Sequence, residues 1–329
     1  IKTSKFELCF PQLLNSSCRK LKRSRSEIVL ISFLLCFISL TTVSLNLLVI
    51  ISISHFKQFH TSTNLLILSL AVSDLLVGLL FLFQIMLTDG YWYLGDRMCV
   101  FYYALDIIIT FISVGNMVLI SIDRYVAICD PLHYPTKVTP KRVQVWVSLC
   151  WISSLFYDIV LLRENLKHPG KFKSCSGVCV IEGGFIEQVA DLVFILIFPI
   201  TVIVVLYVRV FVVVVSQAQA MHTHIAAVTH KRTGKATAKK SELKAAWTLG
   251  VVVVVFLMCL CPYYCITLSE QDTLLNNLSA FFVICLFYFN SCLNPLIYVF
   301  FYPWFRKAIK IIATLQVMKS KNYFAVLMK

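Results

Sequence analysis

Long apolar stretches alternate with short polar segments along the whole chain. Three of these stretches contain no charged residue: Ile28–Ser54, Ala245–Leu268 and Leu274–Phe301. Four more are apolar but carry an interior acid or end on a charge: Thr63–Met86, Met98–Ile122, Val143–Leu162 and Val189–Val208. A helix needs about twenty apolar residues to cross the hydrocarbon core of a bilayer. The pattern therefore predicts seven transmembrane helices, near residues 27–55, 62–87, 96–129, 140–163, 185–217, 240–268 and 276–301.

The same pattern divides the chain into three parts. Residues 1–26 form an extracellular tail, residues 27–301 the seven-helix bundle, and residues 302–329 the last segment. In the last segment, apolar residues and cations between Trp304 and Ile312 fall on opposite faces of a helix. Such a helix lies along a membrane surface. The predicted fold class is an all-α membrane protein, a seven-transmembrane bundle with a short amphipathic C-terminal helix and a cytoplasmic tail.

Composition supports this class and argues against others. The chain is 59% hydrophobic and 14% charged, whereas a soluble domain carries roughly a quarter charged residues. The net charge of +14 is spread over several loops, which does not favour a nucleic-acid-binding face. No cluster of metal ligands and no nucleophile–base pair falls within the spans, so an enzyme is not expected.

Orientation rests on three observations. With the N-terminus outside, Lys and Arg are somewhat more frequent on the cytoplasmic side, as in other membrane proteins, although the basic cluster Arg19–Arg25 favours the reverse. The sequon at Asn15 is meaningful only on the lumenal side. Disulfides also form on that side, and it carries five cysteines: Cys9, Cys18, Cys99, Cys175 and Cys179. We therefore predict an extracellular N-terminus, glycosylated at Asn15.

Two acids carry the main chemical signal, because Asp106 and Asp191 interrupt predicted spans. A carboxylate in hydrocarbon costs a few kcal/mol, so such acids normally face a cavity or a partner. Asp106 precedes Arg124 by about 27 Å of helix, and Asp191 precedes Tyr207 by about 24 Å. Their similar depth predicts a site that receives positive charge at two points.

Polar residues also gather nearer the inner side. Asp123-Arg124-Tyr125 ends the third span, and an arginine there needs water or a partner, for which Glu242 is a candidate. Pro295 removes one backbone hydrogen bond in the last span, and Asn294 is expected to satisfy the freed carbonyls. Further buried polar groups predict one network around water or a small cation, or a packing device: Asn46, Asp74, Ser113, Asn290 and Ser291.

Together these motifs resemble those of rhodopsin-like G-protein-coupled receptors. The similar positions span all seven helices: Asn46, Asp74, Cys99, Asp123-Arg124-Tyr125, Trp151, Pro199, Tyr207, Phe256, Cys259-Leu260-Cys261-Pro262 and Asn294-Pro295-Leu296-Ile297-Tyr298. Within that family the chain is similar to trace amine-associated receptors. That likeness rests on Asn290–Pro295 with Tyr298, Phe301–Lys307, His55–Gln58 with Thr61–Asn64, Cys9-Phe10-Pro11 and Asn15–Cys18.

The resemblance implies roles for individual residues. It implies disulfides Cys99–Cys179 and Cys18–Cys175, with Cys9 left over or exchanging with Cys18. It implies activation and G-protein coupling for Asp123, Arg124, Tyr125, Tyr207, Glu242, Phe256, Asn294, Pro295 and Tyr298. It also implies a polar network, able to hold Na⁺ near Asp74, with Asn46, Ser113 and Asn290. Leu260 departs from the family, because a tryptophan usually stands at its place.

For the ligand, the resemblance implies that Asp106 pairs with an ammonium group and that an acid at Asp191 suits diamines. Aromatic side chains should line the site between them, and the candidates are Tyr263, Tyr264 and Tyr288, the last able to hydrogen-bond Asp106. Glu187 would extend an acidic vestibule. Asp158 is either a third acid of the site or turned to a neighbouring helix or the outer interface.

The leading hypothesis is a receptor for diamines or polyamines such as cadaverine, putrescine or spermine, without a resident cofactor. The resemblance implies a stimulatory or olfactory G protein as partner, cyclic AMP as messenger, and the plasma membrane, including the cilia of olfactory neurons, as location. Two alternatives stay open. One is a monoamine receptor in which Asp191 accepts a polar group, and the other is a cation transporter or channel with paired acids along a path.

Overall fold

The computed structural model describes most of the helical part of the chain. The described residues are 6–8, 12, 19–21, 24–56, 59–88, 92–167, 179, 184–225, 250–251, 254–265, 278–301, 305–306 and 309–310. Several predicted features lie outside them: the sequon at Asn15, Cys9, the Cys18–Cys175 disulfide, Glu242 and most of the segment after residue 301.

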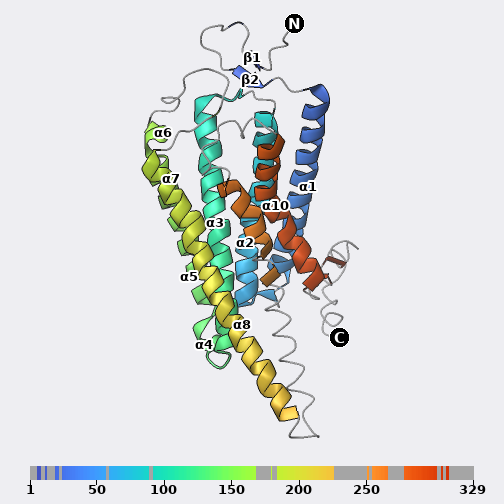
Figure 1. The fold of residues 1–329 in the computed structure, drawn as a ribbon, viewed down its shortest axis with the longest axis vertical. Helices are drawn as coiled ribbons and strands as arrows, with labels where there is room; N and C mark the ends of the chain where they lie inside the picture. The colour runs from blue at the N-terminus through green and yellow to red at the C-terminus, as the bar shows by residue number, and fades with distance from the viewer. Residues whose placement is uncertain are drawn as a thin grey trace.

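The described chain forms a bundle of long helices that stand side by side (Figure 1). The first four long helices are α1 (Arg25–His55), α2 (Ser62–Thr88), α3 (Gly95–Cys129) and α5 (Pro140–Leu161). The fifth is composite, with α7 (Phe185–Asp191), the π-helical stretch η2 (Leu192–Ile197) and α8 (Phe198–Ile225). The helix Val254–Cys265 and α10 (Leu278–Phe301) complete the bundle. Two short helices follow α3 and α5, namely α4 (Tyr134–Lys137) and α6 (Arg163–Lys167).

Length and composition agree with the predicted spans. Five of the described helices are long and apolar enough to cross a membrane, and Val254–Cys265 and Phe282–Ile297 are shorter apolar helices. The predicted end of the fifth helix at residue 217 was wrong, because α8 continues to Ile225. The reason is local: neither glycine nor proline occurs between Pro199 and Gly234, and these two residues are the strongest helix breakers.

Capping residues set two helix starts. Ser24 Oγ accepts from the Glu27 backbone N–H at 3.2 Å, and Glu27 Oε2 accepts from the Ser24 N–H at 3.3 Å. This reciprocal capping box satisfies two donors that α1 would otherwise leave open. Thr139 caps α5 in the same sense, with Pro140 at the first helical position, where its missing N–H costs nothing.

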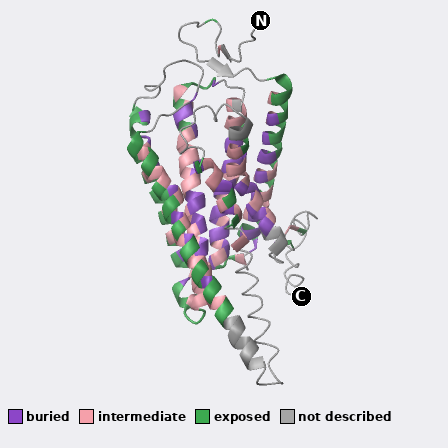
Figure 2. Ribbon diagram, viewed as in Figure 1, coloured by how far each residue is buried: buried purple, intermediate pink, exposed green. Residues whose placement is uncertain are grey.

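Each helix turns its buried residues toward the interior of the bundle. The residues on the outward faces are apolar too. Figure 2 shows exposed residues along the outer sides of α1, α5 and the α7–α8 helix, with buried residues turned inward. The exposed residues include Phe33, Phe156 and Phe211. Helices that are apolar all round suit a lipid environment. At the inner end, Phe305 packs with α1 and α2 residues, including Val49, Ile53 and Ile67.

The tail before α1 contains a two-stranded ribbon that the sequence analysis did not predict. Strands β1 (Phe6–Leu8) and β2 (Arg19–Leu21) pair antiparallel, with Phe6 opposite Leu21 and Leu8 opposite Arg19. The ribbon lies at the end of the bundle where α3 begins (Figure 1).

Candidate functional site

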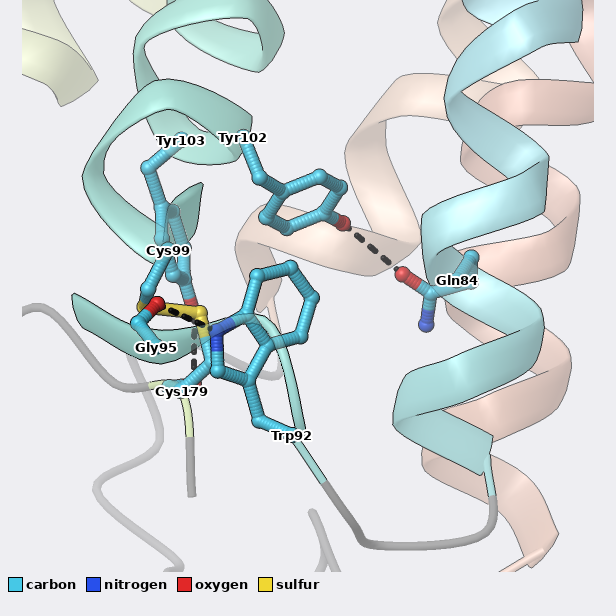
Figure 3. Close-up of a disulfide and its surroundings, with 7 residues drawn as sticks. All are labelled: Gln84, Trp92, Gly95, Cys99, Tyr102, Tyr103 and Cys179. Carbon is cyan, nitrogen blue, oxygen red and sulfur yellow. Dashed lines mark hydrogen bonds between the residues drawn. A yellow bond between two sulfur atoms is a disulfide. The ribbon is translucent and has the colours of Figure 1, made fainter. Parts of the chain in front are cut away.

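A disulfide anchors the N-terminal end of α3. Cys99 and Cys179 are bonded, with their Cα atoms 5.5 Å apart, which confirms the expected pairing. In Figure 3 the bond lies beside Trp92 and Tyr103, and the Tyr103 hydroxyl donates to the Cys179 carbonyl at 3.5 Å. Tyr102 donates to Gln84 Oε1 at 2.9 Å and so links α3 to α2. Cys179, from the segment between α6 and α7, is thereby fastened to α3 one to two turns N-terminal to Asp106.

The first turn of α3 depends on a glycine. Gly95 has a φ of 75°, a left-handed value that glycine adopts without the steric cost of a Cβ. Its carbonyl accepts the indole N–H of Trp92 at 2.7 Å, also drawn in Figure 3. The buried Trp92 ring therefore fixes how the chain enters α3.

Asp106 lies half-buried on α3 and is held by the last helix. The Tyr288 hydroxyl donates to Asp106 Oδ1 at 2.7 Å, so the expected bond between these residues is present. The Tyr288 ring packs edge-on against Phe81 of α2, with centroids 5.5 Å apart. Three helices thus position this carboxylate.

Asp191 is the last residue of α7 and points into the bundle. It is half-buried, and its Oδ2 accepts a hydrogen bond from the Tyr264 hydroxyl at 3.1 Å. The π-helical turn η2 follows directly. Pro199 lacks the N–H for a bond to the carbonyl four residues earlier, and the wider turn before it adapts the helix to that loss. π-Helical turns of this kind are frequent at functional sites.

A row of aromatic rings connects the two acids. From Tyr264 it passes to Tyr263 (centroids 5.4 Å apart), to Phe287 (4.8 Å) and to Tyr288 (5.1 Å). The three tyrosines were predicted from the sequence, whereas Phe287 was not. Phe287 and Phe289 stand on either side of Tyr288 in the sequence. Which of them joins the aromatic row depends on the rotation of α10 about its axis. Tyr264 and Tyr288 each donate to one carboxylate oxygen, and a carboxylate offers about four acceptor positions in total. Both acids therefore retain capacity for a cationic donor.

The other predicted acids lie around this arrangement. Glu187 lies one turn outward on α7, and its Oε2 would be 2.5 Å from a Cβ built on Gly184, so its carboxylate is folded back along the start of the helix. Asp158 on α5 is buried, with 5% of its surface exposed. It is therefore not at the outer interface, one of the three positions that the sequence left open.

Below Asp106, polar side chains form an interior network. Asn294 Nδ2 donates to Asp74 Oδ2 at 2.9 Å, and Ser73 and Ser113 hydroxyls lie 3.2 Å apart. Two buried oxygens, Asp74 Oδ1 and Asn290 Oδ1, have no hydrogen-bond partner among the described residues. Carboxylate and amide oxygens are ligands for a small hard cation, so these residues fit the expected Na⁺.

One expectation about this network was wrong. Pro295 cannot donate to the carbonyl of Ser291, four residues earlier. Asn46 on α1, and not Asn294, satisfies it, because Asn46 Nδ2 donates to the Ser291 carbonyl at 3.0 Å. Asn294 is turned to Asp74 instead. Distance along the chain favoured Asn294, whereas helix packing brought Asn46 to the carbonyl.

A small cavity of about 30 Å³ lies between the network and the acids. Its lining includes Tyr288 above, Leu260 and Phe256 on the sixth helix, and Ser113 and Asn290 below. This volume suffices for about two water molecules. Leucine at position 260 contributes to the cavity wall, at the place where the family usually has tryptophan.

At the C-terminal end of α3, three donors hold the buried Asp123. Arg124 pairs with Asp123 Oδ2 at 2.5 Å, Thr63 donates to the same oxygen at 2.9 Å, and Tyr134 donates to Oδ1 at 2.8 Å. Arg124 also contacts Thr63. The sequence analysis missed Thr63 and Tyr134, which reach Asp123 from α2 and α4. Burial raises the pKa of Tyr134, and the nearby charge of Asp123 adds to the effect, so its hydroxyl stays a donor.

Tyr125, Tyr207 and Tyr298 complete the residues expected to take part in coupling. Tyr125 is half-buried on α3, and a Cβ built on Gly250 would be 3.7 Å from Tyr207 Cε1, so Tyr207 faces the start of the sixth helix. Tyr298 lies in α10, with its side chain outside the described part.

In the loop after α3, hydrogen bonds from Lys137 and His133 lower the pKa of Asp130 from 3.8 to about 2. Because the pKa of Asp130 is lower in the folded protein, its bonds to Lys137 and His133 contribute to folding stability above about pH 4. This contribution to stability is lost as the pH falls toward 2.

Comparison with known proteins agrees with this architecture. The family model described as 7 transmembrane receptor (rhodopsin family) matches residues 45–298. Trace amine-associated receptor 13c of Danio rerio is 35% identical over 96% of this chain and 94% of its own length. Trace amine-associated receptor 8a of Rattus norvegicus is 37% identical (96% and 95%), and receptor 6 of Homo sapiens is 36% identical (96% and 94%). The chain therefore belongs to the rhodopsin family of seven-transmembrane receptors and, within it, to the trace amine-associated receptors.

Proposed function

We propose that this receptor binds diamines or polyamines, with Asp106 and Asp191 each pairing with one ammonium group. The relatives are named for trace amines, which supports an amine as the ligand class. The observation that carries the finer proposal is the aromatic row Tyr264–Tyr263–Phe287–Tyr288 between the two carboxylates. An apolar, aromatic surface between two anionic points suits a methylene chain charged at both ends.

Energetics favour a ligand with two charges. A charge-assisted hydrogen bond from an ammonium group is roughly twice as strong as a neutral one. A diamine leaves neither acid unpaired, whereas a monoamine leaves Asp191 with its one bond from Tyr264. Removing one partner of a buried ion pair typically costs about 3–5 kcal/mol, because the remaining charge is uncompensated.

A monoamine receptor is the second candidate, and one observation favours it. The Tyr264 hydroxyl already donates to Asp191, so this carboxylate is partly satisfied without a ligand. A monoamine would then bind Asp106 alone. The third hypothesis from the sequence, a cation transporter or channel, is at odds with the receptor family to which the chain belongs.

Signalling follows the family as well. The chain is a multi-pass membrane receptor that acts on a heterotrimeric G protein. We extend the proposal to a stimulatory or olfactory G protein, cyclic AMP, an extracellular N-terminus and the plasma membrane, including olfactory cilia. The disulfide at the outer end of α3 supports this orientation, since disulfides persist in oxidising compartments. Ligand binding would shift the population toward a state in which Arg124 leaves its inner contacts.

The site residues enter the proposal in two groups. Around the ligand we place Asp106, Asp191 and the tyrosines, with Glu187 at the entrance. For the change of state we assign the inner group Asp123, Arg124, Tyr125, Tyr207, Glu242, Phe256, Asn294, Pro295 and Tyr298. Na⁺ near Asp74 would be held by this carboxylate with Ser113 and Asn290.

A matched ligand pair tests the proposal. Cadaverine and pentylamine differ by one terminal amine, and both would be compared in a cyclic-AMP assay on cells expressing the receptor. Asp106→Asn should abolish both responses. Asp191→Asn should raise the EC50 of cadaverine by roughly thirty-fold or more, as expected for about 2 kcal/mol, with little change for pentylamine.

Asp96→Asn serves as the control for loss of a negative charge at the outer end, since Asp96 lies in the first turn of α3. Surface levels of every variant would be measured with an epitope tag. Equal potency of cadaverine before and after removal of the Asp191 charge would rule out the two-point model and leave the monoamine receptor.

A further inference from the structure

Asp158 is a buried acid that the two-point model does not use. Only 5% of its surface is exposed, and its Oδ1 has no hydrogen-bond partner among the described residues. Its neighbours Phe156 and Ile159 are 70% and 58% exposed and form the lipid-facing side of α5. Asp158 is therefore turned to the protein interior, where an uncompensated carboxylate costs several kcal/mol.

Helix packing gives the depth of this acid. Cys150, Ser154 and Asp158 are spaced by four residues and share one face of α5. A Cβ built on Gly115 would collide with Sγ of Cys150, so this face packs directly on α3. The two helices run in opposite directions (Figure 1). Eight residues of helix correspond to about 12 Å, which brings Asp158 level with residue 107 of α3, one position from Asp106 along that helix.

The adjacent residue connects this turn of α5 to the other acid. The Tyr157 ring packs against Phe111 of α3, with centroids 5.1 Å apart, and against Phe194 of η2 at 6.0 Å. Phe194 is three residues after Asp191. The Tyr157 ring, on the turn of α5 that carries Asp158, therefore contacts both the helix that carries Asp106 and the helix that carries Asp191. The Tyr157 hydroxyl is also buried without a partner among the described residues.

The described part of α5 and α6 offers no compensating cation at this depth. Its nearest basic residue along the chain, Arg163, is 69% exposed and paired with Glu164. Two polar atoms thus lack partners at the depth of the ligand site, and one of them belongs to an acid. A cationic group supplied by a ligand would neutralise the carboxylate of Asp158 and provide hydrogen-bond donors at this depth.

We infer that Asp158 is a third anionic subsite, which takes the additional ammonium of a linear polyamine. The inference rests on the proposed function, in which Asp106 and Asp191 hold two amines. Simple diamines would leave Asp158 unused, whereas a triamine would pair all three carboxylates. The receptor would therefore prefer triamines over diamines of the same length.

A pair of ligands isolates this contact. Spermidine and 1,8-diaminooctane have the same chain length and differ in one internal group, a secondary ammonium in spermidine and a methylene in the diamine. The wild-type receptor should respond to spermidine at a lower concentration. Asp158→Asn should raise the EC50 of spermidine by about ten-fold or more and leave that of 1,8-diaminooctane within about two-fold. Asp158→Glu should retain the preference.

Two further variants separate the possible failures. Glu164→Gln, an exposed acid just beyond α5, should change neither EC50. Asp191→Asn should weaken both ligands, and its failure to do so would overturn the proposed function itself. Suppose that Asp191→Asn weakens both ligands. The third subsite is then overturned if Asp158→Asn changes the EC50 of the two ligands equally or changes neither. It is also overturned if the wild type shows no preference for spermidine. A loss of surface level with equal shifts would indicate that Asp158 pairs with another part of the chain.

Discussion

The hydroxyl of Tyr264 donates a hydrogen bond to Asp191 across 3.1 Å and ties the sixth helix to the fifth at the depth of the proposed ligand site. The bond between Tyr288 and Asp106 ties α10 to α3 in the same way. Because Tyr263 and Phe287 lie between the two tyrosines, the two acids and their helices form one connected unit. A ligand cation that pairs with either carboxylate therefore acts on the sixth helix. Leu260 and Phe256 of this helix line the small cavity below the acids.

Removal of the Tyr264 hydroxyl tests this connection. Tyr264→Phe keeps the ring but removes the donor to Asp191, and a hydrogen bond to a charged group contributes about 1.5–3 kcal/mol. We expect the EC50 of cadaverine to rise roughly ten-fold. Tyr263→Phe, which keeps the same ring contacts, is the matched control. An unchanged cadaverine response in Tyr264→Phe would show that the hydroxyl does not position Asp191.

The inner network predicts a change in basal activity. Tyr134→Phe removes the donor to Asp123 Oδ1, so the carboxylate that pairs with Arg124 is held less firmly. We expect basal cyclic AMP to rise at matched surface level, since the state with Arg124 bound inward loses roughly 1.5–3 kcal/mol. His133→Ala alters the same loop at Asp130 and should leave basal signalling unchanged. Lower basal signalling in Tyr134→Phe would contradict the role of this contact.

The network around Asp74 predicts stabilisation by sodium. A ligand that binds only the folded state stabilises it by about 1.4 kcal/mol at ten times its Kd. Purified receptor should therefore unfold at a higher temperature in NaCl than in choline chloride of equal ionic strength. Asp74→Asn should remove the difference. If both proteins respond equally to NaCl, the effect is one of general ionic strength and the proposed site is wrong.

The bond from Asn46 to Ser291 predicts a specific rescue. Asn46→Ala leaves the Ser291 carbonyl buried without its donor, which should destabilise the protein by about 1–3 kcal/mol. Pro295→Ala restores a backbone N–H four residues after Ser291. In thermal unfolding in detergent, the double variant should lose less stability than the sum of the single variants. Simple additivity would show that Asn46 does not act through the carbonyl.

The contact of Gly115 with Cys150 predicts a steric clash. Gly115→Ala would place a methyl group against Sγ of Cys150, and overpacking of this kind costs about 1–3 kcal/mol. Cys150→Ala should recover most of that loss in the double variant. Thermal unfolding of the four proteins checks the register of α5 on α3, on which the depth of Asp158 depends. Absence of coupling between the two substitutions would remove that argument.

Local signals determined a large part of this protein. Apolar length alone located the spans, because a helix needs about twenty apolar residues to cross the bilayer. The same pattern did not specify the π-helical turn η2. The depths of Asp106 and Asp191 followed from the constant rise of an α-helix. The Cys99–Cys179 bond, expected from resemblance, is present. These features depend on spacing along one helix or on family motifs, so a single sequence contains them.

Contacts between helices were decided by tertiary structure. Sequence placed Asn294 near the Ser291 carbonyl freed by Pro295, but packing brought Asn46 there from 245 positions away in the chain. It also selected Phe287 over Phe289, added Thr63 and Tyr134 to Asp123, and turned Asp158 inward. The physical reason is that helices apolar on every side carry no pattern that fixes their rotation in lipid. Rotation is set by close packing and by the few polar groups that must find partners, and these conditions act only when all the helices are assembled.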